Sequence, residues 1–209
     1  MRIYRLLAVS LVALIVSVLG SITPQQAVAA SDSPITIALT ATVDGVDDYS
    51  NLLGGAIQPG DTIEGTYTYN AAASDSNSFP FVGDYWDTTT PYGVSLKVGG
   101  LVFETDPQNV SFLVEVVNNY NGRDNYLFRS YNNRRLSNGV NITHIAWQLD
   151  DPTQTALKNT ALPKTAPKLS NWQSIFGLTL EGRTSYGTPG GESQFFVRAH
   201  VTRAQKISR

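Results

Sequence analysis

The sequence predicts an all-β domain, a single antiparallel β-sandwich or jelly-roll-like fold of about eight or nine strands after a cleaved signal peptide. Short runs rich in Val, Ile, Thr, Tyr and Phe recur along the chain, as expected for strands. Clusters of Gly, Pro, Asn and Asp separate these runs and indicate turns. Beyond residue 30 no apolar repeat has the period of a helix.

Residues 1–30 have the order of a secretory signal peptide. A positively charged start is followed by an apolar run over residues 6–19 and by the small-residue site Ala27-Val28-Ala29. The apolar run is shorter than the roughly 20 residues that a membrane-spanning helix needs. We therefore expect cleavage near residue 30, a mature domain over residues 31–209, and a secreted or periplasmic protein with no membrane segment after cleavage.

Composition narrows the possible partners and chemistry. The 209-residue chain has 15 Lys and Arg and 17 Asp and Glu. Because Arg2 and Arg5 lie in the signal, the mature domain has 13 basic and 17 acidic residues, a formal charge of −4. This balance argues against a nucleic-acid partner. The chain has no cysteine, which excludes disulfides and thiolate chemistry. The basic tail, residues 203–209, is expected to be a solvated end.

Nine runs are candidate strands: Ile35–Val43, Thr62–Tyr69, Tyr92–Val98, Leu101–Glu104, Ser111–Val117, Asn125–Tyr131, Ile142–Leu149, Ile175–Leu180 and Gln194–Val201. The seventh shows the clearest alternation of polar and apolar residues. Ile145, Trp147 and Leu149 fall on one face of this run. His144 and Gln148 fall on the other.

The connections between these runs are of two kinds. Gly99-Gly100 fits a two-residue hairpin, because glycine adopts the positive φ angles of primed turns. Residues 70–91 and 150–173 are expected to be long loops. The second loop contains three leucines, and we expect it to pack against the body with Trp172 as its anchor. These leucines are Leu157, Leu162 and Leu169.

Several stretches together resemble a known group of proteins. They include Pro59-Gly60-Asp61-Thr62-Ile63-Glu64-Gly65-Thr66-Tyr67-Thr68-Tyr69, Val98-Gly99-Gly100-Leu101-Val102-Phe103 and Ala146-Trp147-Gln148-Leu149-Asp150-Asp151-Pro152. The chain is similar over nearly its whole mature length to secreted bacterial β-proteins, many of which carry a PEP-CTERM sorting signal. The resemblance implies export and a β fold, but it does not assign an activity. Residues 201–209 lack the Pro-Glu-Pro element of that signal, so it implies a released or periplasmic member.

A segment from Asn118 to Arg135 has the composition of a sugar-binding surface. Aromatic faces pack against the C–H groups of sugars, while amide and guanidinium groups bind their hydroxyls. The predicted glycan-binding residues are Tyr120, Asn121, Arg123, Tyr126 and Tyr131, with Trp86 from the first long loop. The alternative is structural, since Asn and Gly form hairpin turns and Tyr is a favourable strand residue.

Acidic loops suggest a structural calcium ion. Calcium takes oxygen ligands from carboxylates and carbonyls in loops, whereas zinc would require Cys or several His. The predicted calcium ligands are Asp150, Asp151, Asp84 and Asp87. Since aspartate also favours turns for its own hydrogen-bonding reasons, the alternative is that these residues only shape the loops.

Catalytic patterns are sparse. There is no Gly-x-Ser-x-Gly elbow, and the two histidines, His144 and His200, both lie in candidate strands. A glycosidase needs two facing carboxyl groups, which here would have to come from different strands. Glu115, between Val114 and Val116, is the carboxylate to watch: we expect it on the solvent face of a half-exposed strand, and the alternative is a desolvated carboxylate among apolar residues.

The sequence therefore predicts an exported, non-enzymatic module that binds extracellular polysaccharide or matrix. A structural or protein-interaction module without a small ligand, contacting a cell-surface protein, is the main alternative. A polysaccharide-active enzyme is the third hypothesis. A shallow aromatic platform would favour the binding module. A cleft with two facing acids would favour the enzyme, and a featureless polar surface would favour the structural role. Fold class does not choose among the three.

Overall fold

The computed structural model describes residues 34–173, 177–184 and 193–207, and the predicted signal peptide lies outside these described residues. They form ten strands: β1 (Pro34–Asp47), β2 (Thr62–Asn70), β3 (Val82–Asp87), β4 (Gly93–Val98), β5 (Leu101–Glu104), β6 (Phe112–Tyr120), β7 (Arg123–Ser130), β8 (Asn141–Asp151), β9 (Gly177–Arg183) and β10 (Gln194–Ile207). A 3₁₀ turn, η1, covers Leu169–Asn171. All strand pairs are antiparallel, and the strand order is β3-β6-β7-β8-β9-β10-β1-β2-β4-β5. The predicted all-β antiparallel class is confirmed.

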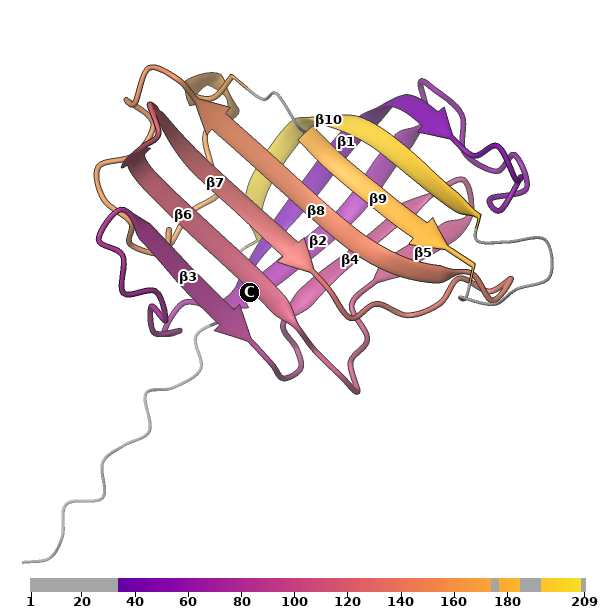
Figure 1. Cartoon of the computed structure of the whole chain (residues 1–209), viewed down its shortest axis with the longest axis horizontal. Helices are drawn as coiled ribbons and strands as arrows, with labels where there is room; N and C mark the ends of the chain where they lie inside the picture. Colours follow the sequence, from indigo (N-terminus) through magenta and orange to yellow (C-terminus); the bar gives the residue numbers. More distant parts are fainter. Residues whose placement is uncertain (1–33, 174–176, 185–192, 208–209) are drawn as a thin grey trace, which may run out of the picture.

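This single sheet curls until its two halves face each other. Strands β2 and β7 are five positions apart in the sheet, which in a flat sheet would separate them by about 24 Å. Yet the rings of Tyr67 on β2 and Phe128 on β7 have centroids 4.7 Å apart. Figure 1 shows β6, β7, β8 and β9 side by side, with β1, β2 and β4 crossing behind them. The core therefore lies inside the curl.

Bulges in the long central strands accommodate the bend. The pairing of β1 with β10 shifts between Thr40 and Ala41 and again between Val43 and Gly45. A bulge bends its strand and increases the local twist, so the two 14-residue strands can belong to both halves. The halves thus form one continuous sheet, where the sequence had suggested the separate sheets of a sandwich.

The core confirms the alternation read from the sequence. Ile145, Trp147 and Leu149 are buried on the inner face of β8. The second long loop packs back on this core, as predicted from its leucines and Trp172. Trp172 lies 6.5 Å from the ring of Tyr126, measured between centroids. The predicted Gly99-Gly100 hairpin is also confirmed, since both residues have positive φ angles.

Neighbouring chain pairs with each outer edge of the sheet at one position. Asp75 forms a bridge with Tyr85 on β3, and Ser76 donates its N–H to the carbonyl of Asp84. At the other edge, Thr105 forms a bridge with Asn133 just beyond β5.

Two elements differ from the prediction. Strand β3 lies within residues 70–91, which were expected to form a loop. Gly83 and the two Asp residues of this strand have low strand propensity. Pairing with all of the facing residues of β6 compensates for this low propensity. Residues 203–207, expected to be a solvated end, instead continue β10 and pair with β1, although most of their side chains are exposed.

Candidate functional site

The outer face of β3, β6, β7 and β8 carries an apolar layer of its own. Side chains alternate along a strand, so residues that follow or precede core residues point outward. Four outward residues are nevertheless buried and do not belong to the core cluster: Leu113, Val117, Leu127 and Ala146. Larger outward side chains must cover them. This outer layer is where the candidate site is built.

Trp86, Tyr131 and His144 form what we call the aromatic row. The ring centroids of Trp86 and Tyr131 are 5.7 Å apart with an interplanar angle of 25°. Those of Tyr131 and His144 are 5.9 Å apart at 29°. Trp86 and Tyr131 are 42% and 40% exposed, which is unusual for large rings. The row therefore presents aromatic surface to solvent.

A pair of carboxyl groups lies next to the row. Asp84 on β3 is paired in register with Glu115 on β6, and both point outward. Burial, and secondarily the Asp84 carboxylate, raise the pKa of Glu115, while Arg129 opposes the shift. Asn77 donates its side-chain N–H to Oδ2 of Asp84 at 2.9 Å, whereas the buried Oδ1 has no partner among the described residues.

Glu115 lies half-buried on the outward face of β6, as expected, and burial there still raises its pKa. Glu115 lies beside the outer apolar layer of Leu113, Val117 and Leu127. A carboxylate in such surroundings loses hydration, which favours its neutral form.

Beside the aromatic row the surface is hollowed. A hollow of about 590 Å³ is lined by Tyr131, Thr143, His144, Glu181, Gly182, Arg183, Gln194, Phe195 and Phe196. A second, of about 390 Å³, includes Asn109, Asn132, Asn133, Arg135 and Asn141 and shares Tyr131, Thr143 and Arg183 with the first. Nδ1 of His144 lies 3.5 Å from a carboxylate oxygen of Glu181. Because they share lining residues, the two hollows form one polar groove.

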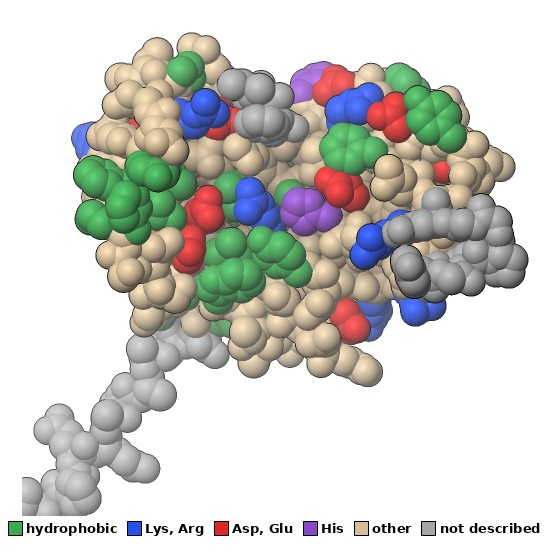
Figure 2. Space-filling view, viewed as in Figure 1, with side chains coloured by type: hydrophobic (Ala, Val, Ile, Leu, Met, Phe, Trp, Pro, Cys, Tyr) green, Lys and Arg blue, Asp and Glu red, His purple; other side chains and the backbone are tan. Residues whose placement is uncertain are grey.

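A second group of exposed aromatic rings occupies the other end of β3. Phe79 lies 5.5 Å from Phe81 and 5.1 Å from Tyr120, measured between ring centroids. All three are exposed, and we call them the phenylalanine cluster. Figure 2 shows this face with a band of acidic, basic and histidine side chains between two groups of hydrophobic ones.

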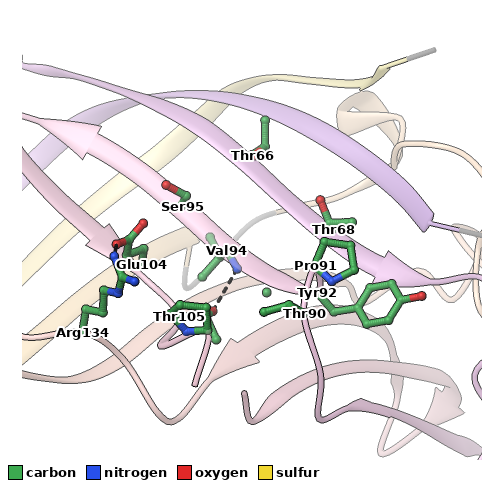
Figure 3. A pocket seen from close by; sticks show the side chains of 12 residues that line it. Thr66, Thr68, Thr90, Pro91, Tyr92, Val94, Ser95, Glu104, Thr105 and Arg134 are labelled. Atoms are coloured by element: carbon green, nitrogen blue, oxygen red, sulfur yellow. Dashed lines mark hydrogen bonds and ion pairs between the residues drawn. The ribbon is translucent and has the colours of Figure 1, made fainter. Parts of the chain in front are cut away.

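A different hollow, of about 380 Å³, lies on the opposite half of the sheet (Figure 3). Its polar groups already bond to one another: Oγ1 of Thr105 accepts the N–H of Val94 at 2.9 Å. Arg134 and Glu104 form an ion pair at 2.8 Å. The same Thr105 hydroxyl lies 2.7 Å from that of Ser130. These contacts tie β5 to the end of β7, so we interpret this hollow as a structural junction.

The structure divides the predicted glycan-binding residues among four places, the fourth being the core, which holds Tyr126. Trp86 and Tyr131 come together in the aromatic row, although 45 positions separate them. Tyr120 belongs to the phenylalanine cluster. Asn121 has a positive φ and forms the β6–β7 turn, and Arg123 lies 3.7 Å from Asp150.

The inclusion of Tyr126 among the glycan-binding residues was wrong. This residue is 1% exposed, and its hydroxyl lies 2.9 Å from that of Tyr67 inside the core. Its position in β7 explains the error, because the strand alternation turns Tyr126 inward while Asn125 and Leu127 point outward. The sequence segment alone could not distinguish the two directions.

The predicted calcium ligands do not converge. Asp84 points outward from β3 and Asp87 inward, as their odd spacing requires. Asp150 and Asp151 are consecutive and also face opposite sides. Asp150 contacts Asn125, while Asp151 accepts N–H groups of residues 153, 155 and 156. In the described part of the chain, no group of three or more His, Asp or Glu is placed to hold a metal ion.

Sequence reasoning missed several residues of the groove. His144 and Glu181 pair across β8 and β9, a register that no local pattern reveals. Gln194 joins them because β10 pairs with β9. One signal was present: the alternation in β8 already placed His144 on the face opposite the core. Phe79 and Phe81, in a Pro-containing loop, gave no periodic signal.

No helix formed by the described residues has the length and hydropathy that a membrane crossing requires. Comparison with known proteins identifies no relative: no protein-family profile, no curated protein and no solved structure matches the chain.

Proposed function

We propose that this protein binds polysaccharide through the aromatic row and the polar groove beside it. The single observation that carries the proposal is the convergence of Trp86 and Tyr131, both about two-fifths exposed, at the border of a groove. Trp86 is paired in register with the buried Leu113, so it projects outward from a face whose inner layer is already filled.

The chemistry of the site suits a sugar. The C–H face of a pyranose packs on an aromatic ring, and burying that surface stabilises the complex. Its hydroxyl groups both donate and accept hydrogen bonds. The groove offers acceptors at Glu181 and donors at Arg135, with Gln194 able to do both.

The setting of the site supports a polymer over a small metabolite. A small-molecule pocket usually encloses most of its ligand, whereas these hollows are open depressions on the outside of a sheet. Together with the predicted signal peptide, this favours an extracellular or periplasmic polysaccharide as the partner.

The proposal is tested with the purified mature domain, residues 31–209, on a panel of neutral and acidic polysaccharides in affinity gels and by calorimetry. Trp86→Ala and Tyr131→Ala should each weaken binding by about 5- to 30-fold, the equivalent of about 1–2 kcal/mol for a central aromatic contact. Tyr49→Ala is the matched control, because Tyr49 is 97% exposed and lies on the loop after β1.

Circular dichroism and thermal melts establish that each variant is folded. Binding that survives both aromatic substitutions would move the site elsewhere. If the folded wild-type domain retains none of the polymers, polysaccharide binding is refuted and the protein-interaction alternative gains weight.

A further inference from the structure

We infer that the bound polymer runs along β3, from the aromatic row to the phenylalanine cluster, and that it is a neutral polysaccharide recognised over several sugar units. This inference rests on the proposed function and specifies its ligand. It follows from three observations: two aromatic groups on one face, the distance between them, and the charge of the surface that separates them.

The two aromatic groups mark the ends of one strip. Phe81 immediately precedes β3, and Trp86 is near its end. The two residues are five positions apart in the sequence, which corresponds to about 17 Å along an extended chain. On the neighbouring strand, Tyr120 ends β6 next to Phe79, and Leu113 pairs with Trp86. A disaccharide does not bridge such a distance, whereas a longer oligosaccharide lying along the strip contacts both groups.

The charge between the two groups disfavours an acidic polymer. Asp84 and Glu115 lie midway along the strip. Arg129 interacts with Glu115, so it offsets part of this negative charge. The mature domain has a formal charge of −4 as well. A uronic-acid or sulfated chain would bring further anions next to this carboxyl pair, which costs binding free energy.

Two linked weak contacts give a specific dependence on chain length. When one end of an oligosaccharide is bound at the aromatic row, the other end reaches the phenylalanine cluster at a high effective concentration. Affinity should therefore rise steeply once the chain is long enough to span both groups. It should not rise in this way if the aromatic row acts alone.

The experiment measures binding of β-1,4-linked gluco-, manno- and xylo-oligosaccharides of two, four and six units to the mature domain by calorimetry. We expect the best six-unit ligand to bind at least about tenfold more tightly than its two-unit form. Phe81→Ala and Tyr120→Ala should remove most of that gain and leave the two-unit affinity unchanged. Trp86→Ala should weaken all lengths, and Tyr49→Ala none. Carboxymethylation of the bound polymer should weaken binding, and Glu115→Gln should restore part of it.

The outcomes separate the two proposals. Equal affinity at all lengths, or unchanged six-unit affinity in Phe81→Ala and Tyr120→Ala, refutes the extended strip while binding at the aromatic row stands. Stronger binding of the carboxymethylated polymer refutes the neutral ligand. If sedimentation shows a dimer that Phe81→Ala dissociates, the cluster is an interface between copies and the strip is refuted. Binding of no saccharide at all refutes the proposed function itself.

Discussion

The two tyrosines at the centre of the core should behave as a coupled pair. The hydroxyls of Tyr67 and Tyr126 lie 2.9 Å apart, and both side chains are essentially inaccessible to water. Burial raises the pKa of both hydroxyls well above the ordinary tyrosine value, so they remain neutral and bonded to each other. This hydrogen bond connects the two halves of the curled sheet inside the core, since Tyr67 lies on β2 and Tyr126 on β7.

The magnitude follows from what each substitution leaves behind. In Tyr67→Phe the hydroxyl of Tyr126 loses its partner in a dry core, and an unsatisfied buried polar group costs about 1–3 kcal/mol. Tyr126→Phe leaves the hydroxyl of Tyr67 in the same position. The double substitution removes both groups and leaves no unpaired atom, so its cost should be close to zero and at most about 1 kcal/mol.

Urea unfolding of the four proteins measures the effect. The double variant should be more stable than either single variant, with a coupling free energy of about 1–3 kcal/mol and unchanged m values. If the costs of the single substitutions simply add in the double variant, the hydroxyls are independently hydrated or bonded elsewhere. That result would refute a coupled hydroxyl pair that connects the two halves inside the core.

Two further predictions concern pH. Burial and the nearby Asp84 raise the pKa of Glu115 above its ordinary 4.5, so the stability contributed by its neutral form is complete below pH 4.5 and lost as the pH rises through the shifted value. Glu115→Gln should then raise Tm at pH 7, by about 2–4 °C for each kcal/mol of unfolding free energy that is regained. It should also flatten the dependence of Tm on pH between pH 4.5 and 7. An unchanged pH dependence in this variant would contradict the prediction. Although burial alone would raise the pKa of Asp151, hydrogen bonds from the Thr153 and Thr155 side chains and backbone lower it far below 3.8. The stability contributed by the Asp151 carboxylate is present above about pH 3.8 and is lost as the pH falls. Asp151→Asn should therefore lower the free energy of unfolding by about 2–4 kcal/mol at pH 7 and remove part of the acid sensitivity below pH 4, both measured by urea unfolding. Equal acid sensitivity in the variant and the wild type would count against this prediction.

The strands could be predicted from the sequence because their signal is local. In β8 the apolar side chains occur at every second position, and the structure buries the same three residues. Strand β3 escaped because its signal is not local. Gly83, Asp84 and Asp87 disfavour a strand individually, and only the partner residues of β6 make the extended conformation favourable.

The candidate site could be predicted only in part, for the same physical reason. Trp86 and Tyr131 were recognised as exposed aromatic candidates from residue type and neighbours. Their contact depends on the pairing of β3, β6 and β7, which brings residues 45 positions apart within 5.7 Å. Tyr126 shows the converse limit: composition singled it out, but the direction of its side chain was set by the register of β7.

The carboxyl pair also bears on the hypothesis of a polysaccharide-active enzyme. Retaining and inverting glycosidases hold their two carboxyl groups about 5–5.5 Å and about 6.5–9.5 Å apart, so that the scissile bond fits between them. Asp84 and Glu115 come from paired positions on adjacent strands and project side by side from the same outer face of the sheet, so they do not face each other across a cleft. The pair therefore does not flank a scissile bond. We accordingly expect an intact polymer to be recovered after prolonged incubation, and the release of reducing ends that Glu115→Gln abolishes would overturn this interpretation.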